Sequence, residues 1–370
     1  MRSPRELRAA DQGMEYEIMK SYVVRQFGAA LAEVETATPA PRGTEVLIEV
    51  RHCGVCHTDV HLREGSFDLG GGRRLNVRLQ LPHVLGHEIE GQVVAAGPEA
   101  GSVRIGARAA VFPWIGCGRC RACVRGQENL CLGEARQLGC SSGWPGGYAT
   151  HVLVPHPRYL LDYGETEAAL AAACMCSGLT AFSALKKVGR PEADDPTLLI
   201  GCGGVGLMGI QFARALFPGA PLAADIDPGR LAAARASGAS ATYDAADPET
   251  PKRIRTDTGN GAGAGAVVDF VGSEASFALA SRVVRPGGRI IVVGLFGGAM
   301  HLPLPLVALR ALSVIGSNTG TLGEAKEMMS LVRAGRVRAI PLSRRPLADA
   351  EGALSELQRG TVTGRVVLVP

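Results

Sequence analysis

Residues 197–216 read TLLIGCGGVGLMGIQFARAL and decide the fold of the second half of the chain. The first four residues are apolar and predict a buried strand, while the residues after the glycines predict a helix. Gly201, Gly203 and Gly206 form the pattern G-x-G-x-x-G between them. Such glycines permit a tight turn and let a pyrophosphate approach the backbone at the helix N-terminus. The stretch therefore predicts the strand–turn–helix unit of a dinucleotide-binding domain.

The next apolar segment, PLAADI, carries the carboxylate that such a domain needs. Asp225 lies in it, about 20 residues beyond the last glycine of the turn. A carboxylate there accepts hydrogen bonds from ribose hydroxyls and repels a 2′-phosphate, so the sequence predicts NAD rather than NADP. Asp227 is a nearby alternative, and Arg230 is a cation of the kind that accommodates a 2′-phosphate.

Three further apolar segments continue the alternation of strands and helices. They read GAVVDFVGS, RIIVVGLFG and LSVIGSNTG and lie at 265–273, 289–297 and 312–320. Strands that alternate with helical segments are typical of a doubly wound parallel sheet. The region therefore predicts an α/β domain.

A cluster of four cysteines precedes this region, in the stretch CGRCRACVRGQENLC. Cys117, Cys120, Cys123 and Cys131 follow the spacing C-x2-C-x2-C-x7-C. A disulfide framework, an iron–sulfur cluster and a zinc site are three interpretations of it. The bacterial ferredoxin spacing continues with x3-C-P, which is absent here, whereas four thiolates on one tight loop suit tetrahedral zinc. Four thiolates around one zinc ion leave no open position, so we predict a structural site and place the chemistry elsewhere.

A second metal-binding pattern lies in CGVCHTDVH (53–61) and LPHVLGHEIEG (81–91). Cys56 and His87 are candidate zinc ligands, and a third thiolate is available from Cys174 or Cys176. Two thiolates, one neutral imidazole and one zinc ion sum to zero charge. Three protein ligands with one open position are the pattern of a catalytic zinc, which activates a bound oxygen.

The composition limits the function further. The chain has 370 residues, 46% of them apolar, and a formal net charge of +4 with acids and bases interspersed. That balance favours neither nucleic acid nor an anionic membrane as a partner. No apolar run approaches the roughly 18 residues that span a bilayer, the alanine-rich stretch at 168–176 being the nearest. The N-terminus lacks the apolar core of a secretory signal, so we expect a cytoplasmic protein whose ten cysteines are thiols or metal ligands.

These motifs, in this order, resemble the zinc-dependent alcohol dehydrogenases of the medium-chain dehydrogenase/reductase superfamily. The matching segments extend from about residue 19 to the C-terminus and include CGVCHTDVH, GHEIEGQVVAAG, the four-cysteine loop, CSGLT and GCGGVG. The stretches PW, VGLFG and GRVVLVP are most similar to the tetrameric bacterial and archaeal enzymes of broad alcohol specificity. The resemblance implies NAD and two zinc ions per chain as cofactors. It also implies a small-molecule alcohol and its aldehyde or ketone as substrates, and a homo-oligomer, with a tetramer favoured over a dimer.

The resemblance also implies the domain organisation. Residues 1–18 are expected to be a disordered tail, with Met19 near the natural start of the first domain. An irregular, β-rich GroES-like catalytic domain with the structural-zinc lobe is expected over 19–175. A doubly wound Rossmann domain is expected over 176–314, and 315–370 returns to complete the catalytic domain. The active site is then expected in the cleft between the domains.

Residue roles follow from matching positions in the family. Cys176, directly before SGLT, fits the third catalytic zinc ligand better than Cys174. Glu88 is expected near the zinc as a supporting or transient ligand, and Asp59 as the hydrogen-bond partner of a ligand imidazole. Thr58 and His61 are expected to carry the alcohol proton to water. Trp114 is expected to line an apolar substrate pocket. The residues expected to contact the cofactor, besides the three glycines and Asp225, are His57, Gly204, Val205, Arg230, Leu295 and Arg365.

Other functions remain open at this level. A zinc-dependent polyol or amino-alcohol dehydrogenase has the same fold but needs a polar pocket, which Trp114 does not favour. A zinc-free quinone or enoyl reductase of the superfamily lacks the catalytic ligands that this chain has. A non-enzymatic nucleotide-binding protein has no need of the Thr58 and His61 pair.

Overall fold

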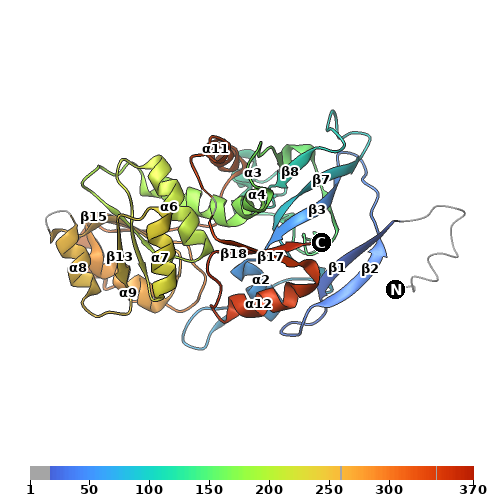
Figure 1. Cartoon of the computed structure of the whole chain (residues 1–370). Helices are drawn as coiled ribbons and strands as arrows, with labels where there is room; N and C mark the ends of the chain where they lie inside the picture. The colour runs from blue at the N-terminus through green and yellow to red at the C-terminus, as the bar shows by residue number, and fades with distance from the viewer. Residues whose placement is uncertain (1–16, 259–260, 339) are drawn as a thin grey trace, which may run out of the picture.

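The computed structural model describes residues 17–258, 261–338 and 340–370. The chain forms a doubly wound α/β region and a β-rich region side by side, and the C-terminal strands return to the β-rich region (Figure 1). The predicted combination of a Rossmann-type domain and a β-rich catalytic domain is therefore confirmed. Most of the tail expected over 1–18 lies outside the described residues, but Ile18 already begins the first strand.

The α/β region is built on a six-stranded parallel sheet with the order β13-β12-β11-β14-β15-β16. Its strands are β11 (Thr197–Ile200), β12 (Leu222–Asp225), β13 (Ala241–Asp244), β14 (Ala264–Asp269), β15 (Val284–Val292) and β16 (Ser313–Gly316). Its helices are α6 (Gly204–Leu216), α7 (Pro228–Ser237), α8 (Thr250–Asp257), α9 (Glu274–Val283) and α10 (Leu304–Leu309). The carboxyl ends of the strands form the edge at which open α/β sheets bind their ligands.

The predicted glycine turn joins β11 to α6. Gly201 has φ +91°, a conformation that residues with a side chain rarely adopt. A Cβ on Gly206 would lie 1.8 Å from the carbonyl oxygen of Gly201, so only glycine fits this close contact between helix and turn. The tight turn and its close packing against the helix N-terminus therefore have the form that the sequence predicts.

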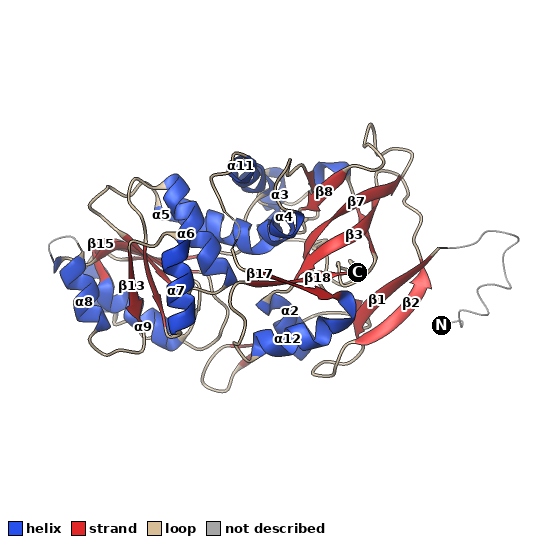
Figure 2. Cartoon of the chain, in the orientation of Figure 1, coloured by secondary structure: helices blue, strands red, loops and turns tan. Residues whose placement is uncertain are grey.

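The β-rich region contains a seven-stranded sheet with the order β10-β8-β7-β3-β18-β17, in which β9 also pairs with β3. Its strands are β3 (Val46–Gly54), β7 (Glu88–Ala96), β8 (Arg108–Val111), β9 (His151–Val154), β10 (Leu160–Leu161), β17 (Leu342–Pro346) and β18 (Arg365–Val369). The C-terminal β18 pairs with β3, so the end of the chain lies in the same sheet as this early strand (Figure 2).

Smaller elements complete this region. Two of them form short sheets: β2-β1-β6, and the hairpin β4-β5. Their bounds are β1 (Ile18–Val24), β2 (Ala32–Ala37), β4 (Ser66–Asp68), β5 (Arg74–Asn76) and β6 (His83–Val84). The helical elements are α2 (His57–Glu64), α3 (Arg121–Val124), η1 (Glu128–Leu130), η2 (Pro157–Tyr159), α11 (Leu322–Arg333), η5 (Leu347–Asp349) and α12 (Ala350–Gln358).

One continuous helix, Ala168–Val188, joins the two regions. It consists of α4 (Ala168–Ala173), a π-helical turn η3 (Cys174–Gly178) and α5 (Leu179–Val188). The boundary expected between residues 175 and 176 falls inside this helix, and the boundary expected after 314 falls inside β16. The helix has 21 residues and is apolar enough to span a membrane by length and composition, so the expectation that no run is long enough was wrong. Of the most apolar 18 residues of this helix, 89% are buried within the protein, as in a core helix.

The two regions share an apolar core. Ile48 of β3, Met175 of η3, Met208 of α6 and Leu354 of α12 belong to one contiguous cluster, and all four are fully buried. A smaller cluster lies within the α/β region alone. The η3 turn is therefore held from both sides, which fixes the position of the cysteines that it carries.

Candidate metal centres and active site

Three predicted ligands meet between the two regions. Cys56 precedes α2, His87 precedes β7, and Cys176 lies in η3. All three are buried, and their ligand atoms lie within 4.8 Å of one another. The sulfurs of Cys56 and Cys176 are 3.9 Å apart. Two sulfurs at about 2.3 Å from one zinc ion, at the tetrahedral angle, lie roughly 3.8 Å apart. The cluster fits a zinc ion with three protein ligands.

The imidazole of His87 is oriented by a buried carboxylate. Its Nδ1 lies 3.1 Å from Oδ1 of Asp59, and both side chains are fully buried. Nε2 of His87 has no hydrogen-bond partner within the described part of the chain. With the proton on Nδ1, donated to Asp59, the lone pair of Nε2 is free to bind a metal. The unpartnered nitrogen therefore has the form of a zinc ligand.

Asp59 also organises the backbone around the cluster. Its Oδ2 accepts hydrogen bonds from the backbone N–H of Cys56 at 3.0 Å and from the hydroxyl of Tyr148 at 3.1 Å. Its Oδ1 accepts a longer one, 3.2 Å, from the backbone N–H of Gly86. Tyr148 was not predicted as a site residue, because no local motif around it indicates metal support. Only the fold brings its hydroxyl to Asp59.

Cys174 takes no part in this cluster. It is fully buried and outside the group of three, and burial raises the pKa of its thiol. The choice of Cys176 over Cys174 therefore agrees with the geometry. His83, in β6, is also buried and likewise lies outside both metal clusters.

Glu88 forms a buried ion pair beside the zinc ligands. Both of its carboxylate oxygens are bonded by the guanidinium of Arg365, and both residues are buried. Burial raises the pKa of Glu88, and the charge of Arg365 opposes that rise. A Cβ on Gly204 would lie 3.3 Å from Nη1 of Arg365, so the guanidinium spans the space between Glu88 and the glycine turn. This arrangement places a positive charge where a pyrophosphate would approach the turn.

The two residues expected to relay a proton lie on α2. Thr58 is half-buried in the first turn, and His57 is exposed beside it. His61 is half-buried one turn further along, with its ring 4.7 Å from that of Phe67. Burial lowers the pKa of His61, although the nearby backbone of Leu295 opposes this effect. His61 of the catalytic domain and the expected cofactor residue Leu295 of the α/β region are thus neighbours.

Trp114 packs directly on the zinc cluster. Its ring centroid lies 5.3 Å from that of His87, and its Nε1 donates a hydrogen bond of 3.0 Å to the carbonyl of Met175. The side chain is 5% exposed. The indole therefore provides an apolar wall beside the metal centre with its polar atom satisfied.

The predicted ribose-binding carboxylate lies at the end of β12. Oδ2 of Asp225 accepts a hydrogen bond of 2.6 Å from the backbone N–H of Cys202 in the glycine turn. Arg230 donates instead to the backbone carbonyls of Gly360 and Val362, in the returning segment. Val205 is partly buried in the first turn of α6. Asp225 thus lies beside the glycine turn, whereas the guanidinium of Arg230 is hydrogen-bonded to backbone carbonyls.

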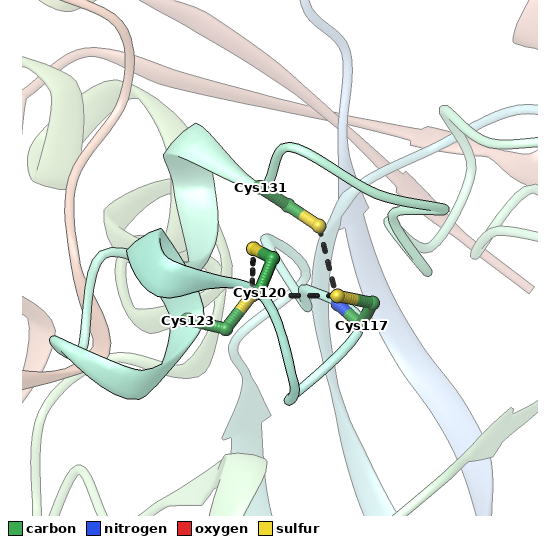
Figure 3. Close-up of side chains that lie close together, drawn as sticks. All are labelled: Cys117, Cys120, Cys123 and Cys131. Carbon is green, nitrogen blue, oxygen red and sulfur yellow. Dashed lines mark hydrogen bonds between the residues drawn. The ribbon is translucent and has the colours of Figure 1, made fainter.

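The four-cysteine loop forms the second metal cluster. Its sulfur atoms also lie within 4.8 Å of one another, at 3.5 Å between Cys120 and Cys123 and 4.0 Å between Cys117 and Cys123 (Figure 3). Backbone N–H groups, chiefly those of Cys123 and Leu132, lower the pKa of Cys120 to about 6. Four converging sulfurs with N–H support fit a closed structural zinc site.

A buried carboxylate anchors this lobe to the catalytic domain. Glu128 accepts hydrogen bonds from the backbone N–H of Gly116 at 3.1 Å, the hydroxyl of Tyr159 at 2.9 Å and the guanidinium of Arg158 at 2.9 Å. The first of these lies within the lobe and the other two on η2. Glu128 was not predicted, since its role depends on contacts outside the cysteine motif.

Known proteins match the chain over nearly its whole length. Residues 42–163 match the alcohol dehydrogenase GroES-like domain, and residues 204–334 match the zinc-binding dehydrogenase family. An NAD-dependent alcohol dehydrogenase of Sulfurisphaera tokodaii is 34% identical over 95% of this chain and 100% of its own length.

Solved structures agree with these matches. The structure of an NAD-dependent alcohol dehydrogenase matches with a TM-score of 0.85 and 29% identity, over 95% of this chain and 99% of that chain. The alcohol dehydrogenase of Aeropyrum pernix has a TM-score of 0.83 at 27% identity, covering 95% and 100%. The fold, both metal clusters and these matches agree, and the chain belongs to the NAD- and zinc-dependent alcohol dehydrogenases of the medium-chain dehydrogenase/reductase superfamily.

Proposed function

We propose that this protein transfers hydride reversibly between an apolar primary or secondary alcohol and NAD, giving an aldehyde or ketone. The observation that carries the proposal is the group of Cys56, His87 and Cys176, three protein ligands that would leave the fourth position of a tetrahedral zinc site open. A zinc ion held there would lower the pKa of an alcohol, as it lowers that of water. The remaining steps depend on the residues around it.

The chain's own residues would prepare the site for this reaction. Asp59 holds the His87 ring in the orientation that directs Nε2 to the metal. The guanidinium of Arg365, fixed by Glu88, would bind the pyrophosphate at the turn that contains Gly204. Asp225 would accept hydrogen bonds from the adenosine ribose, with Val205 and Leu295 near the nicotinamide half. Together they would hold the cofactor across the cleft at a fixed distance from the metal.

The alcohol proton must leave a buried site. Thr58 and His61 lie on the same face of α2, one turn apart, which supports the expected path from the Thr58 hydroxyl to the His61 imidazole. His61 is half-buried, and its lowered pKa keeps it neutral and able to accept a proton near neutral pH. His61 would therefore pass the proton to solvent.

The wall formed by Trp114 supports apolar substrates over polyols. An indole whose only polar atom is already bonded to Met175 offers no hydrogen bond to a second hydroxyl. The test is kcat/KM measured with NAD for benzylic, medium-chain and secondary alcohols and for sugar alcohols. Higher values for the apolar series support the proposal, and turnover of polyols alone would favour the polyol dehydrogenase alternative.

An exposed apolar surface supports a homo-oligomer. It includes Met300, Leu304, Leu306, Leu309 and Val314, between 36% and 83% exposed, on α10, the loop before it and β16. β16 is also the edge strand of its sheet, where backbone groups are available for pairing. We expect a dimer through this edge, assembling into a tetramer. Light scattering of the wild-type protein and of Leu309→Glu would test it, and a wild-type monomer would contradict it.

The thiol chemistry supports a reducing compartment such as the cytoplasm. The ten cysteines are free thiols in the structure, and seven of them belong to the two metal clusters. Thiolate metal sites persist where disulfides are not favoured.

A further inference from the structure

A side chain of the structural-zinc lobe, Asn129, forms a hydrogen bond to the α/β region. Asn129 lies in η1, between the anchoring Glu128 and the zinc ligand Cys131. Its Nδ2 donates a hydrogen bond of 2.9 Å to the backbone carbonyl of Asn318. Asn318 follows β16, 189 positions further along the chain. The lobe therefore reaches the carboxyl edge of the parallel sheet.

The contacted segment, Ser317–Gly320, is confined at both ends. The backbone N–H of Ser317 donates to the carbonyl of Val292, the last residue of β15, at 2.9 Å. Thr321 is the N-cap of α11 and forms a capping box, in which its hydroxyl accepts a hydrogen bond of 3.1 Å from the backbone N–H of Glu324. The segment thus spans the short gap between a strand end and a capped helix.

The segment also packs against the helix that carries a catalytic zinc ligand. A Cβ on Gly320 would lie 2.6 Å from Cδ1 of Leu179, three residues beyond Cys176. Thr319 has φ +45°, an unfavourable conformation for a β-branched residue. Such a conformation persists only where neighbouring contacts impose it. The Leu179 contact lies on one side of the segment, and the Asn129 hydrogen bond supplies a second constraint.

Two buried hydroxyls of the segment have no hydrogen-bond partner among the described residues. They are Oγ of Ser317 and Oγ1 of Thr319. Buried hydroxyls are normally bonded, so unpartnered ones at a ligand-binding edge indicate groups available to a ligand. The shape of this segment should therefore affect how the cofactor binds.

We propose that Asn129 is a positioning residue, through which the structural-zinc lobe holds Ser317–Gly320 in the conformation that binds the cofactor. The inference rests on the proposed NAD-dependent function. The lobe then has a second role besides local stability: its order is transmitted by the Asn129–Asn318 hydrogen bond to the edge of the cofactor site. Without that bond the strained segment relaxes, and the cofactor must restore its shape on binding.

The test is the dissociation constant of NADH, measured by fluorescence titration of the zinc-loaded protein without substrate. Asn129→Ala is expected to raise it roughly 2- to 10-fold, the usual effect of one net hydrogen bond. The KM for NAD should rise by a similar factor, with kcat changed less than about twofold. Gln127→Ala, an exposed position in the same loop, is the control and should match the wild type. Asn129→Asp keeps the size of the side chain, removes the donor and should behave like Asn129→Ala.

Each outcome decides the proposal. If both Asn129 variants keep two zinc ions per chain and bind NADH as tightly as the wild type, the proposal is overturned. If both lose the structural zinc, Asn129 stabilises the lobe itself, and the proposal is again overturned. Failure of the wild-type protein to bind NADH would instead contradict the proposed function on which the inference rests.

Discussion

Asp59 and His87 form a fully buried pair, with Oδ1 of the carboxylate 3.1 Å from Nδ1 of the imidazole. The other carboxylate oxygen accepts a hydrogen bond from the backbone N–H of Cys56. One side chain therefore fixes two of the three catalytic zinc ligands, which come from different parts of the chain. The geometry of the metal centre depends on this carboxylate as much as on the ligands.

Asp59→Asn should weaken binding of the catalytic zinc by roughly 10- to 100-fold, the usual effect of losing such a supporting group. Both oxygens of Asp59 accept hydrogen bonds, so the N–H₂ group of an asparagine would face a hydrogen-bond donor in either orientation of the amide. Zinc per chain under chelator competition measures the effect, and the four-cysteine site should keep its metal. Tyr148→Phe, which removes only one hydrogen bond to Asp59, should have a smaller effect. Equal zinc affinity in Asp59→Asn and the wild type would show that the carboxylate does not support the site.

Cys176→Ala should lose one zinc ion per chain and all measurable turnover, because two ligands cannot hold the metal in a buried site. Cys174→Ala is the matched control, since this thiol is as buried but outside the cluster. It should keep two zinc ions and its activity. Elemental analysis and initial rates measure both variants, and the reverse result would assign the third ligand to Cys174.

His61→Gln should change the pH dependence of alcohol oxidation without loss of zinc. Burial lowers the pKa of His61 below its usual value of 6.5, so the imidazole is neutral at pH 7 and becomes protonated only as the pH falls below that value. The wild-type rate should therefore fall on the acid side of pH 6.5, where His61 can no longer accept a proton. The variant should be slower near neutral pH, by up to about 100-fold, and should lack that decline. A variant that retains the wild-type pH profile would exclude His61 from the proton path.

Asp225→Ser should raise the KM for NAD and reduce the preference for NAD over NADP by about 10-fold or more. The substitution removes both the acceptor for the ribose hydroxyls and the charge that repels a 2′-phosphate. Asp227→Asn is the control, because asparagine can still cap α7 as Asp227 does through the N–H of Arg230. Comparable kcat/KM for NAD and NADP in the wild-type protein would refute the assignment of Asp225.

The elements that were predicted correctly are those with local signals. The glycine turn, its strand and its helix occupy one contiguous stretch, and the cysteine loop carries its complete ligand set within fifteen residues of sequence. Periodicity and ligand spacing are properties of such short stretches, so the sequence alone was sufficient for them.

The contacts that were missed join distant residues or cross the expected boundaries. Tyr148 reaches Asp59 only through the fold, and Asn129 meets Asn318 across the two regions. The alanine-rich stretch at 168–176 is too short by itself, but the apolar pattern continues beyond it through η3 into α5, so the expectation based on this stretch alone was wrong. Residue patterns indicate elements, whereas such contacts depend on how the elements pack.

The most direct test of the central claim is the formation of NADH when the zinc-loaded protein is mixed with NAD⁺ and an apolar alcohol. The wild-type protein should produce NADH, and removal of the catalytic zinc, or Cys176→Ala, should abolish this while the four-cysteine site keeps its metal. NADH formation that is unchanged without the catalytic zinc, or its absence across all alcohols with both zinc ions bound, would contradict the account.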